Sequence, residues 1–389
     1  MKILLITEAL LPQPGNNANL ISKLIPFLAE GHEVHIIAPA EKYDGLPNSI
    51  FEVPVHWTMD SARDVMRRFV YPAVAKIVDS NGYSDALQSM IIQREIKKLR
   101  QEYNFDAVIS TSEPFVSAVT SAELDNVKRI LYIMDPPASV CNEKSTAFRE
   151  RRLDDVLEKQ TLILTTPFIR DALSKCGFER YDGKISTVGF PMIESHIKGD
   201  THIINTCNGK INLLFCGWLY SDIRSPKYFL DIVSRLDERF CVYFMGKECD
   251  KLRERFEFET KADVITLPQQ PYQTAIDAMF DADILINIGN SVPVHMPSKT
   301  LEYINTCKPM VNFYKLEGCP TRYYTDRYPL CLNQFEGDEN VDAAAEKFIG
   351  FCLANKGKTV EREYIEREFA DCTPQYIAHQ ILDVLGDEK

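Results

Sequence analysis

The sequence predicts an α/β protein made of two doubly wound domains that face each other across a cleft. Three observations support this prediction. The chain has 389 residues, which is too long for one ordinary hydrophobic core and suits two domains of typical size. Short apolar runs alternate with longer helical patterns, which indicates parallel strands buried on both faces and joined by helices. The alternation pauses once, over residues 190–210, where the chain is polar and contains proline and glycine.

The first half of the chain contains four strand-like runs: KILLIT, EVHIIAP, FDAVIST and KRILYIMD. Helical patterns follow the first three of them, at NLISKLIPFLAEG, within residues 60–103 and near residues 114–125. Strand–helix alternation of this kind builds right-handed βαβ units. We therefore expect an N-terminal domain over residues 1–190.

A second series of strands and helices follows a linker that we place at residues 191–210. Its strand-like runs are INLLFCG, FCVYFMG, DVITLP, ADILINIG and PMVNFY, and its helices are expected at residues 225–238, 249–259, 271–281 and 298–307. This series predicts a C-terminal domain over residues 211–372. The last segment, residues 373–389, has a helical pattern and is expected to pack back on the N-terminal domain.

The composition indicates which partners the protein can bind and which cellular compartment it occupies. Apolar residues make up 45% of the chain and charged residues 26%, as in a soluble globular protein, and the net charge of −12 argues against nucleic acid as a partner. Eleven cysteines form no CxxC pair or Cys/His cluster, so we expect reduced thiols, no metal site and a cytoplasmic location.

Membrane association is expected to be peripheral at most. No run approaches the roughly 20 apolar residues that a spanning helix needs, and MKILLIT is too short for a signal peptide. Residues 61–76 mix arginine and lysine with aromatic side chains. They could rest on an anionic membrane surface at the inner face of the membrane, and the alternative is an ordinary amphipathic surface helix.

Ligands of open parallel sheets bind beyond the carboxyl ends of strands, so the loops after the strands are the candidate sites. Gly15 and Asn16 precede the first helical pattern, where free backbone N–H groups favour a phosphate. The alternative is a turn with an asparagine cap. No GxGxxG follows the first strand, so a dinucleotide fingerprint is absent.

Two loops of the second half contain cations near expected helix starts. Gly217 ends a strand, and Arg224 precedes Ser225-Pro226, a plausible N-cap and first helical residue. An arginine beside a helix start favours an anion, and the alternative is a solvated surface arginine. Tyr272 follows another strand and could stack on a base.

The segment HMPSKTLEY combines a lysine and a glutamate at the start of a helix. Pro297 and Ser298 can begin the helix, with Ser298 as N-cap, and Lys299 then opposes the helix dipole unless an anion lies nearby. Glu302 could accept hydrogen bonds from sugar hydroxyls. A capping box is the alternative, but its glutamate lies three residues after the cap, whereas Glu302 lies four after Ser298. His295 enters the same loop and could contact a sugar.

Two carboxylates end strands in the first half of the chain. Glu113 follows FDAVIST and Asp135 ends KRILYIMD. Either could act as a base or orient a hydroxyl. The alternative is that they are turn-forming carboxylates before proline.

These loops together resemble those of the two-domain GT-B glycosyltransferases, most closely the retaining enzymes of glycosyltransferase family 4. The resemblance covers nearly the whole chain: the opening strand, glycine-containing loop and GHEV strand, then INLLFCGWLYSDIRSP, then DADILINIGNSVPVHMPSKTLEYINTCKPMV. The last block is similar to the family's aD…psK…Ey…gkPvv pattern and is the most specific. The resemblance implies Rossmann-like domains and sugar transfer from a nucleotide-diphosphate sugar, with UDP favoured. It further implies retention, a glycan or lipid-linked acceptor, and no cofactor or metal.

The resemblance also implies residue roles. Glu302 matches the second glutamate of the family's Glu-x7-Glu motif, which holds the donor ribose. Arg224 matches a cation that binds the diphosphate. The remaining matches are helix-start and loop residues beside the donor phosphates, namely Ser298, Lys299, Gly15 and Asn16.

The sequence departs from the family pattern at three places. Val294 stands where the motif has its first glutamate, and Trp218 stands where a second cation often follows the glycine. The family's histidine in the first domain is not evident, and Asp135 or Glu113 occupies its region. Two alternatives therefore stay open: a nucleotide-sugar epimerase of the same fold, and a catalytically silent sugar-nucleotide-binding protein.

Overall fold

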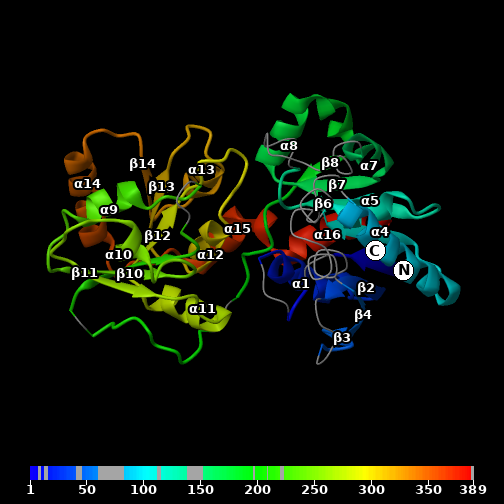
Figure 1. Cartoon of the computed structure of the whole chain (residues 1–389), viewed down its shortest axis with the longest axis horizontal. Helices are drawn as coiled ribbons and strands as arrows, with labels where there is room; N and C mark the ends of the chain where they lie inside the picture. The colour runs from blue at the N-terminus through cyan, green and yellow to red at the C-terminus, as the bar shows by residue number, and fades with distance from the viewer. Residues whose placement is uncertain are drawn as a thin grey trace. The chain divides into compact units, whose positions relative to one another are not determined.

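The computed structural model describes residues 1–7, 10–12, 16–40, 46–59, 83–111, 115–137, 152–195, 198–207, 209–219 and 223–386. The chain divides into two compact units (Figure 1). The first unit comprises Met1–Pro191 and Asp371–Lys389, and the second comprises Met192–Ala370. Each unit contains its own sheet, which confirms the predicted α/β class with two doubly wound bodies. No helix in the described ranges has both the length and the apolar character needed to cross a membrane.

The sheet of the first unit has the strand order β3-β4-β2-β1-β5-β6-β7-β8 among the described residues. All neighbouring strands are parallel except β3 and β4. The order turns in opposite directions from β1 and β5, so the switch point of this sheet lies between them. The strands are β1 (Lys2–Ile6), β2 (Glu33–Ala40), β3 (Ser49–Ile50), β4 (Val53–Met59), β5 (Ala107–Thr111), β6 (Lys128–Ile133), β7 (Leu162–Thr165) and β8 (Ile185–Thr187).

Consecutive residues of the central strands are buried, because helices cover both faces of the sheet. The last helix of the chain packs against the first one, red against blue in Figure 1. Lys128 fastens it by donating to the carbonyl oxygens of Val384 (3.1 Å) and Leu385 (2.9 Å). The helices of this unit are α1 (Asn16–Leu28), α4 (Tyr83–Glu102), α5 (Val116–Ala122), α7 (Leu153–Lys159), α8 (Pro167–Leu173) and α16 (Pro374–Leu385).

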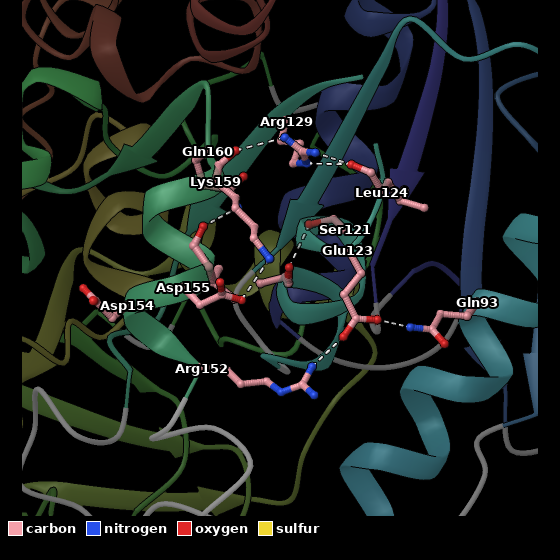
Figure 2. A network of polar contacts seen from close by, with 12 residues as sticks. Gln93, Ser121, Glu123, Leu124, Arg129, Arg152, Asp154, Asp155, Lys159 and Gln160 are labelled. Carbon is pink, nitrogen blue, oxygen red and sulfur yellow. Dashed lines mark hydrogen bonds and ion pairs between the residues drawn. The ribbon is translucent and has the colours of Figure 1, made fainter. Parts of the chain in front are cut away.

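A polar network ties three of these helices to the amino-terminal end of β6 (Figure 2). Glu123, just after α5, accepts hydrogen bonds from Gln93 of α4 and from Arg152, 2.5 Å away, at the start of α7. Arg129 of β6 donates to the carbonyl oxygens of Leu124 (2.9 Å) and Lys159 (3.3 Å). The network therefore stabilises the amino-terminal end of β6, which is the end opposite the predicted ligand-binding loops.

The sheet of the second unit is parallel throughout, with the order β11-β10-β9-β12-β13-β14. From β9 the chain builds outward through β10 and β11, and from β12 it builds the other way. The switch point therefore lies between β9 and β12. The strands are β9 (Ile211–Cys216), β10 (Phe240–Met245), β11 (Asp263–Leu267), β12 (Ile284–Ile288), β13 (Met310–Tyr314) and β14 (Cys331–Phe335).

Aromatic side chains fill the core on one face of this sheet. Phe229 lies 5.7 Å from Phe244, 5.1 Å from Phe313 and 6.0 Å from Phe348, measured between ring centroids. Their large buried area and tilted packing stabilise the attachment of α9 and α14 to the sheet. The helices are α9 (Lys227–Val233), α10 (Leu252–Arg255), α11 (Tyr272–Asp281), α12 (Lys299–Asn305), α13 (Pro320–Thr325), α14 (Val341–Asn355) and α15 (Arg362–Glu368).

Candidate functional site

The candidate site lies at the carboxyl ends of β9 and β12, on both sides of the switch point of the second sheet. Tyr303 of α12 fixes this region. Its buried hydroxyl accepts from the N–H of Cys216 (2.8 Å) and donates to the carbonyl oxygen of Cys216 (3.1 Å). Burial raises the pKa of Tyr303, so the phenol stays neutral and can donate. The start of α12 is therefore held beside the last residue of β9.

Lys299 and Glu302 form an ion pair in the first turn of α12. The Lys299 Nζ contacts Oε2 of Glu302, and the Glu302 side chain is only 3% exposed. Burial alone would lower the pKa of Lys299, but the Glu302 carboxylate raises it above its usual range. Lys299 is therefore charged, and its position at the helix start is compensated by a carboxylate of the protein itself.

The predicted capping role of Ser298 is wrong. Ser298 precedes α12 as expected, but its hydroxyl makes no capping hydrogen bond. Pro297 is buried, and its carbonyl oxygen accepts from the N–H of Thr300 at 3.1 Å, so a backbone turn begins the helix instead. Because α12 has only seven residues, its dipole is small and the side-chain charges dominate the local field.

Arg224 joins the loops after β9 and β12. Its Nε donates to Oδ1 of Asn290 at 3.0 Å, and Nδ2 of Asn290 donates to the carbonyl oxygen of His295 at 3.1 Å. A Cβ atom placed on Gly217 would lie 3.6 Å from Nη1 of Arg224. The guanidinium of Arg224 therefore lies beside the backbone of Gly217, and Asn290 fixes its orientation.

The predicted start of the helix after Arg224 is wrong by one residue. The helix begins at Lys227, so Pro226 precedes it rather than opening it. The Ser225 hydroxyl accepts from the N–H of Lys227 at 3.3 Å. The loop still ends at Ser225-Pro226. However, Pro226 and not Ser225 occupies the N-cap position of the helix.

Tyr272 extends the cluster on the side of α11. It is the first residue of that helix, and its ring centroid lies 5.7 Å from Nζ of Lys299. The side chain is 43% exposed, unlike the buried tyrosines of the core. An exposed ring beside a cation can stack on a planar base.

Gly246 allows the backbone after β10 to approach the backbone after β9 very closely. It follows β10 with a φ of 136°, and a Cβ atom there would lie 2.0 Å from the carbonyl oxygen of Gly217. Only glycine allows this close approach of two backbones. The position of Gly217 therefore depends on the neighbouring strand.

Asp135 is the one predicted carboxylate of the first unit that the structure describes. It follows β6, and its Oδ2 accepts a hydrogen bond of 3.2 Å from Nδ2 of Asn17. Helix α1 begins at Asn16, so both asparagines belong to its first turn rather than to the preceding loop. Gly15, Glu113, the side chain of Asn16 and residues 61–76 lie outside the described part of the chain.

Four residues of this region were missed by the sequence analysis: Asn290, Tyr303, Lys315 and Glu336. Lys315 follows β13, and its Nζ lies 3.8 Å from Oε2 of Glu336 and 3.5 Å from the carbonyl oxygen of Ser225. Lys315 comes directly after the run PMVNFY, so the rule that selects loops after buried strands could have found it. Nothing in the sequence pairs it with Glu336, because only the adjacency of β13 and β14 does so.

The whole length of the chain resembles several solved structures. A lipopolysaccharide outer core galactosyltransferase, WaaB, is 13% identical with a TM-score of 0.61, and the alignment covers 100% of both chains. HepE of Anabaena, in complex with UDP and glucose, is 13% identical with a TM-score of 0.57, covering 99% of this chain and 96% of that one. An E. coli structure described as "Trehalose-6-phosphate … bound with UDP-2-fluoro glucose" is 9% identical with a TM-score of 0.66 over 100% of both chains.

Sequence comparisons add nothing to this likeness. No protein-family model matches the chain, and no curated protein matches it either. At identities of 9–13% a structural likeness establishes the fold alone. The chain has the GT-B fold, as the resemblance in its sequence predicted, while its membership of family 4 stays a prediction.

Proposed function

We propose that this protein is a glycosyltransferase that moves a sugar from a UDP-sugar to a glycan or lipid-linked acceptor. One observation carries the proposal. Arg224, Lys299, Glu302 and Tyr272 meet at the switch point of the second sheet, where α/β folds bind nucleotides. Two of the similar structures hold UDP or a UDP-sugar derivative, which supports UDP as the nucleotide.

The cations would act on the leaving group. When the bond between sugar and diphosphate breaks, negative charge grows on the phosphate oxygens. Arg224, oriented by Asn290, and Lys299, held charged by Glu302, would stabilise that charge from fixed positions. This supply of positive charge is why we propose transfer without a metal ion. Each cation would contribute a charge-assisted hydrogen bond, worth about 1.5–3 kcal/mol.

Glu302 and Tyr272 would hold the nucleoside. An ionised carboxylate has about four acceptor positions, and Lys299 contacts one oxygen of Glu302. The carboxylate could therefore still accept from the ribose hydroxyls, while the exposed ring of Tyr272 stacks on the base. His295, Pro297 and Ser298 would line the same loop.

The acceptor would be oriented by carboxylates of the first unit. We propose Asp135, fixed by Asn17, and Glu113 for this role. Retention at the anomeric carbon rests on the resemblance to family 4 alone.

A second candidate is a catalytically silent protein that binds nucleotide sugars. Val294, where the motif has its first glutamate, favours it, because valine offers neither charge nor hydrogen bond to a transferred sugar. Its φ of 63° is also unusual for a β-branched residue.

Turnover assays on UDP-glucose, UDP-galactose and UDP-N-acetylglucosamine, with and without a panel of glycan and lipid-linked acceptors, test the proposal. A transferase releases UDP only with an acceptor, and Arg224→Met should slow it about 10–100-fold. Arg239→Met is the matched control, because Arg239 pairs with Asp237 at the opposite edge of the sheet. A changed sugar from donor alone would indicate an epimerase, and binding without turnover would indicate the silent protein.

A further inference from the structure

A second pair of charged side chains lies next to Arg224. Lys315 follows β13 and Glu336 follows the neighbouring strand β14, so both end at the edge of the sheet that carries the candidate site. Their side chains are 17% and 11% exposed. The Lys315 Nζ is 3.5 Å from the carbonyl oxygen of Ser225, the residue after Arg224. The pair therefore borders the loop that presents the guanidinium.

The positive charge of Arg224 acts on Tyr303, which lies beside the Lys299–Glu302 pair, and on Lys315. This charge lowers the pKa of Tyr303, although burial dominates and raises it. Burial lowers the pKa of Lys315, Glu336 opposes this change, and Arg224 adds to it. Two partly buried cations thus repel each other here.

The compensation by Glu336 is incomplete. The distance of 3.8 Å between Nζ of Lys315 and Oε2 of Glu336 is longer than a direct hydrogen bond. Glu336 therefore offsets the repulsion between Lys315 and Arg224 only in part. An anion that reaches both would relieve their repulsion and gain a charge-assisted bond to each.

Building on the proposed function, we propose that Lys315 binds the diphosphate of the nucleotide together with Arg224, and that Glu336 is the counterion which the diphosphate displaces from Lys315. The diphosphate supplies at least two negative charges, enough to pair with both Arg224 and Lys315, while Lys299 keeps Glu302 as a counterion. Glu336 then serves as the internal substitute for phosphate in the empty site.

This arrangement makes nucleotide binding depend on pH. Burial raises the pKa of Glu336 to about 7, against the opposing charge of Lys315. Below that pH the carboxyl is neutral and does not compete. Above it the carboxylate competes for Lys315 and repels the phosphate, so affinity should fall as pH rises from 6 to 8. Other titratable groups of the described residues lie near the pair. They are Arg224 before α9, Tyr228 in α9, Cys319 at the start of α13 and Asp338 after β14.

Calorimetric titration of UDP into the full chain at pH 6, 7 and 8 tests the proposal. Lys315→Met should weaken binding about tenfold or more, and Lys315→Arg should retain most of it. Glu336→Gln should bind several-fold more tightly than wild type at pH 8 and equally at pH 6. Because the terminal phosphate of UDP itself titrates near pH 6, the difference between Glu336→Gln and wild type is the informative quantity.

Lys308→Met is the matched control. Lys308 precedes β13 at the opposite end of the strand, where its Nζ donates to the carbonyl oxygen of Ala282 at 2.6 Å, and burial lowers its pKa as it does for Lys315. This variant should bind UDP like wild type. Circular dichroism of each variant separates lost contacts from lost folding.

Three outcomes would overturn the proposal. If Arg224→Met loses UDP but Lys315→Met binds like wild type, Lys315 is outside the site while the proposed function stands. If Glu336→Gln follows the wild-type pH profile, Glu336 is not the displaced counterion. If wild type binds no nucleotide, the proposed function fails and this inference fails with it. Should Lys315→Met not fold, Lys315→Arg and Glu336→Gln decide by the same criteria.

Discussion

Lys299 and Glu302 act as one unit at the scale of single residues. The Glu302 side chain is 3% exposed, so it is tolerated as a carboxylate because Lys299 lies against it. Removing one partner of a buried pair leaves an uncompensated charge, whereas removing both leaves none. The stability of the pair and its proposed contact with a nucleotide therefore depend on each other.

A double-mutant cycle tests this unit. Glu302→Gln and Lys299→Met should each lower the free energy of unfolding by about 3 kcal/mol, and the double variant should lose clearly less than the sum. Urea unfolding at pH 7 measures all four proteins. Additive losses would mean that the two side chains do not interact in the folded protein.

Glu336 predicts a specific pH dependence of stability. Its folded pKa of about 7 lies above the ordinary value of 4.5, so between these values the folded protein binds more protons than the unfolded chain. The stability of wild type should therefore fall as pH rises from 5 to 7 and then level off. Between pH 5 and 8 the stability of Glu336→Gln relative to wild type should improve by about 1–3 kcal/mol. Urea unfolding measures both proteins at pH 5 and pH 8. The same difference in unfolding free energy between Glu336→Gln and wild type at both pH values would contradict a buried, competing carboxylate.

Residues that directly follow buried strands could be recognised from the sequence. Gly217 directly follows β9, and Arg224 lies in the same loop, which brings the two residues close together. The counterion of Lys315 could not be recognised. Glu336 is close to Lys315 only through the pairing of β13 with β14, and no local pattern records that pairing. The capping role of Ser298 failed because a backbone turn at Pro297 made the cap unnecessary.

At the scale of elements, α12 is positioned by its attachment to β9. The Tyr303 hydroxyl bonds both backbone groups of Cys216, so the helix that carries Lys299 follows any movement of the strand. Gly246 adds a second constraint on the same strand end through its close approach to Gly217. The site is therefore held by neighbouring elements rather than by its loops alone.

Tyr303→Phe should separate positioning from general stability. Removing the hydroxyl leaves the N–H and the carbonyl of Cys216 without this partner, which should cost about 1–3 kcal/mol of unfolding free energy and weaken UDP binding. Tyr132→Phe is the control, because its buried hydroxyl donates to the carbonyl oxygen of Gly189 at 2.7 Å in the first unit. It should lower stability similarly and leave UDP affinity unchanged. Equal effects of both variants on UDP affinity would refute the positioning role of Tyr303.

Gly246→Ala should destabilise the second unit. Its Cβ would meet the carbonyl oxygen of Gly217 at 2.0 Å, and its φ of 136° is unfavourable for alanine. We expect a loss of about 2–4 kcal/mol, measured by urea unfolding. Gly318→Ala is the control, since no atom lies within 4 Å of its Cβ position. A mild effect at Gly246 would show that β10 does not constrain the end of β9.

Helix lengths were the weakest of the element predictions. The helix expected over residues 249–259 is only Leu252–Arg255, because Phe256 continues in extended conformation. Phe256 and Phe258 then pack against the core with a spacing of two residues, which suits an extended segment. Tertiary packing of these two rings therefore decides that the helix ends at Arg255, because so short a segment shows no single clear period.

At the scale of the whole molecule, continuous apolar runs were enough to predict two parallel sheets. Ile211–Cys216 and Phe240–Met245 are buried along their full lengths, as strands covered on both faces must be. The sequence could not specify the switch point between β9 and β12, because strand order depends on which strands pair and not on any one segment.

Calorimetric titration of UDP, GDP and ADP into wild type, Arg224→Met and the Arg239→Met control tests whether the loops after β9 and β12 bind a nucleotide. UDP should bind wild type and the control with a dissociation constant on the order of micromolar, and Arg224→Met should weaken this binding about tenfold or more. If no nucleotide binds, or if Arg224→Met binds UDP as tightly as the control, the candidate site at β9 and β12 is not a nucleotide site.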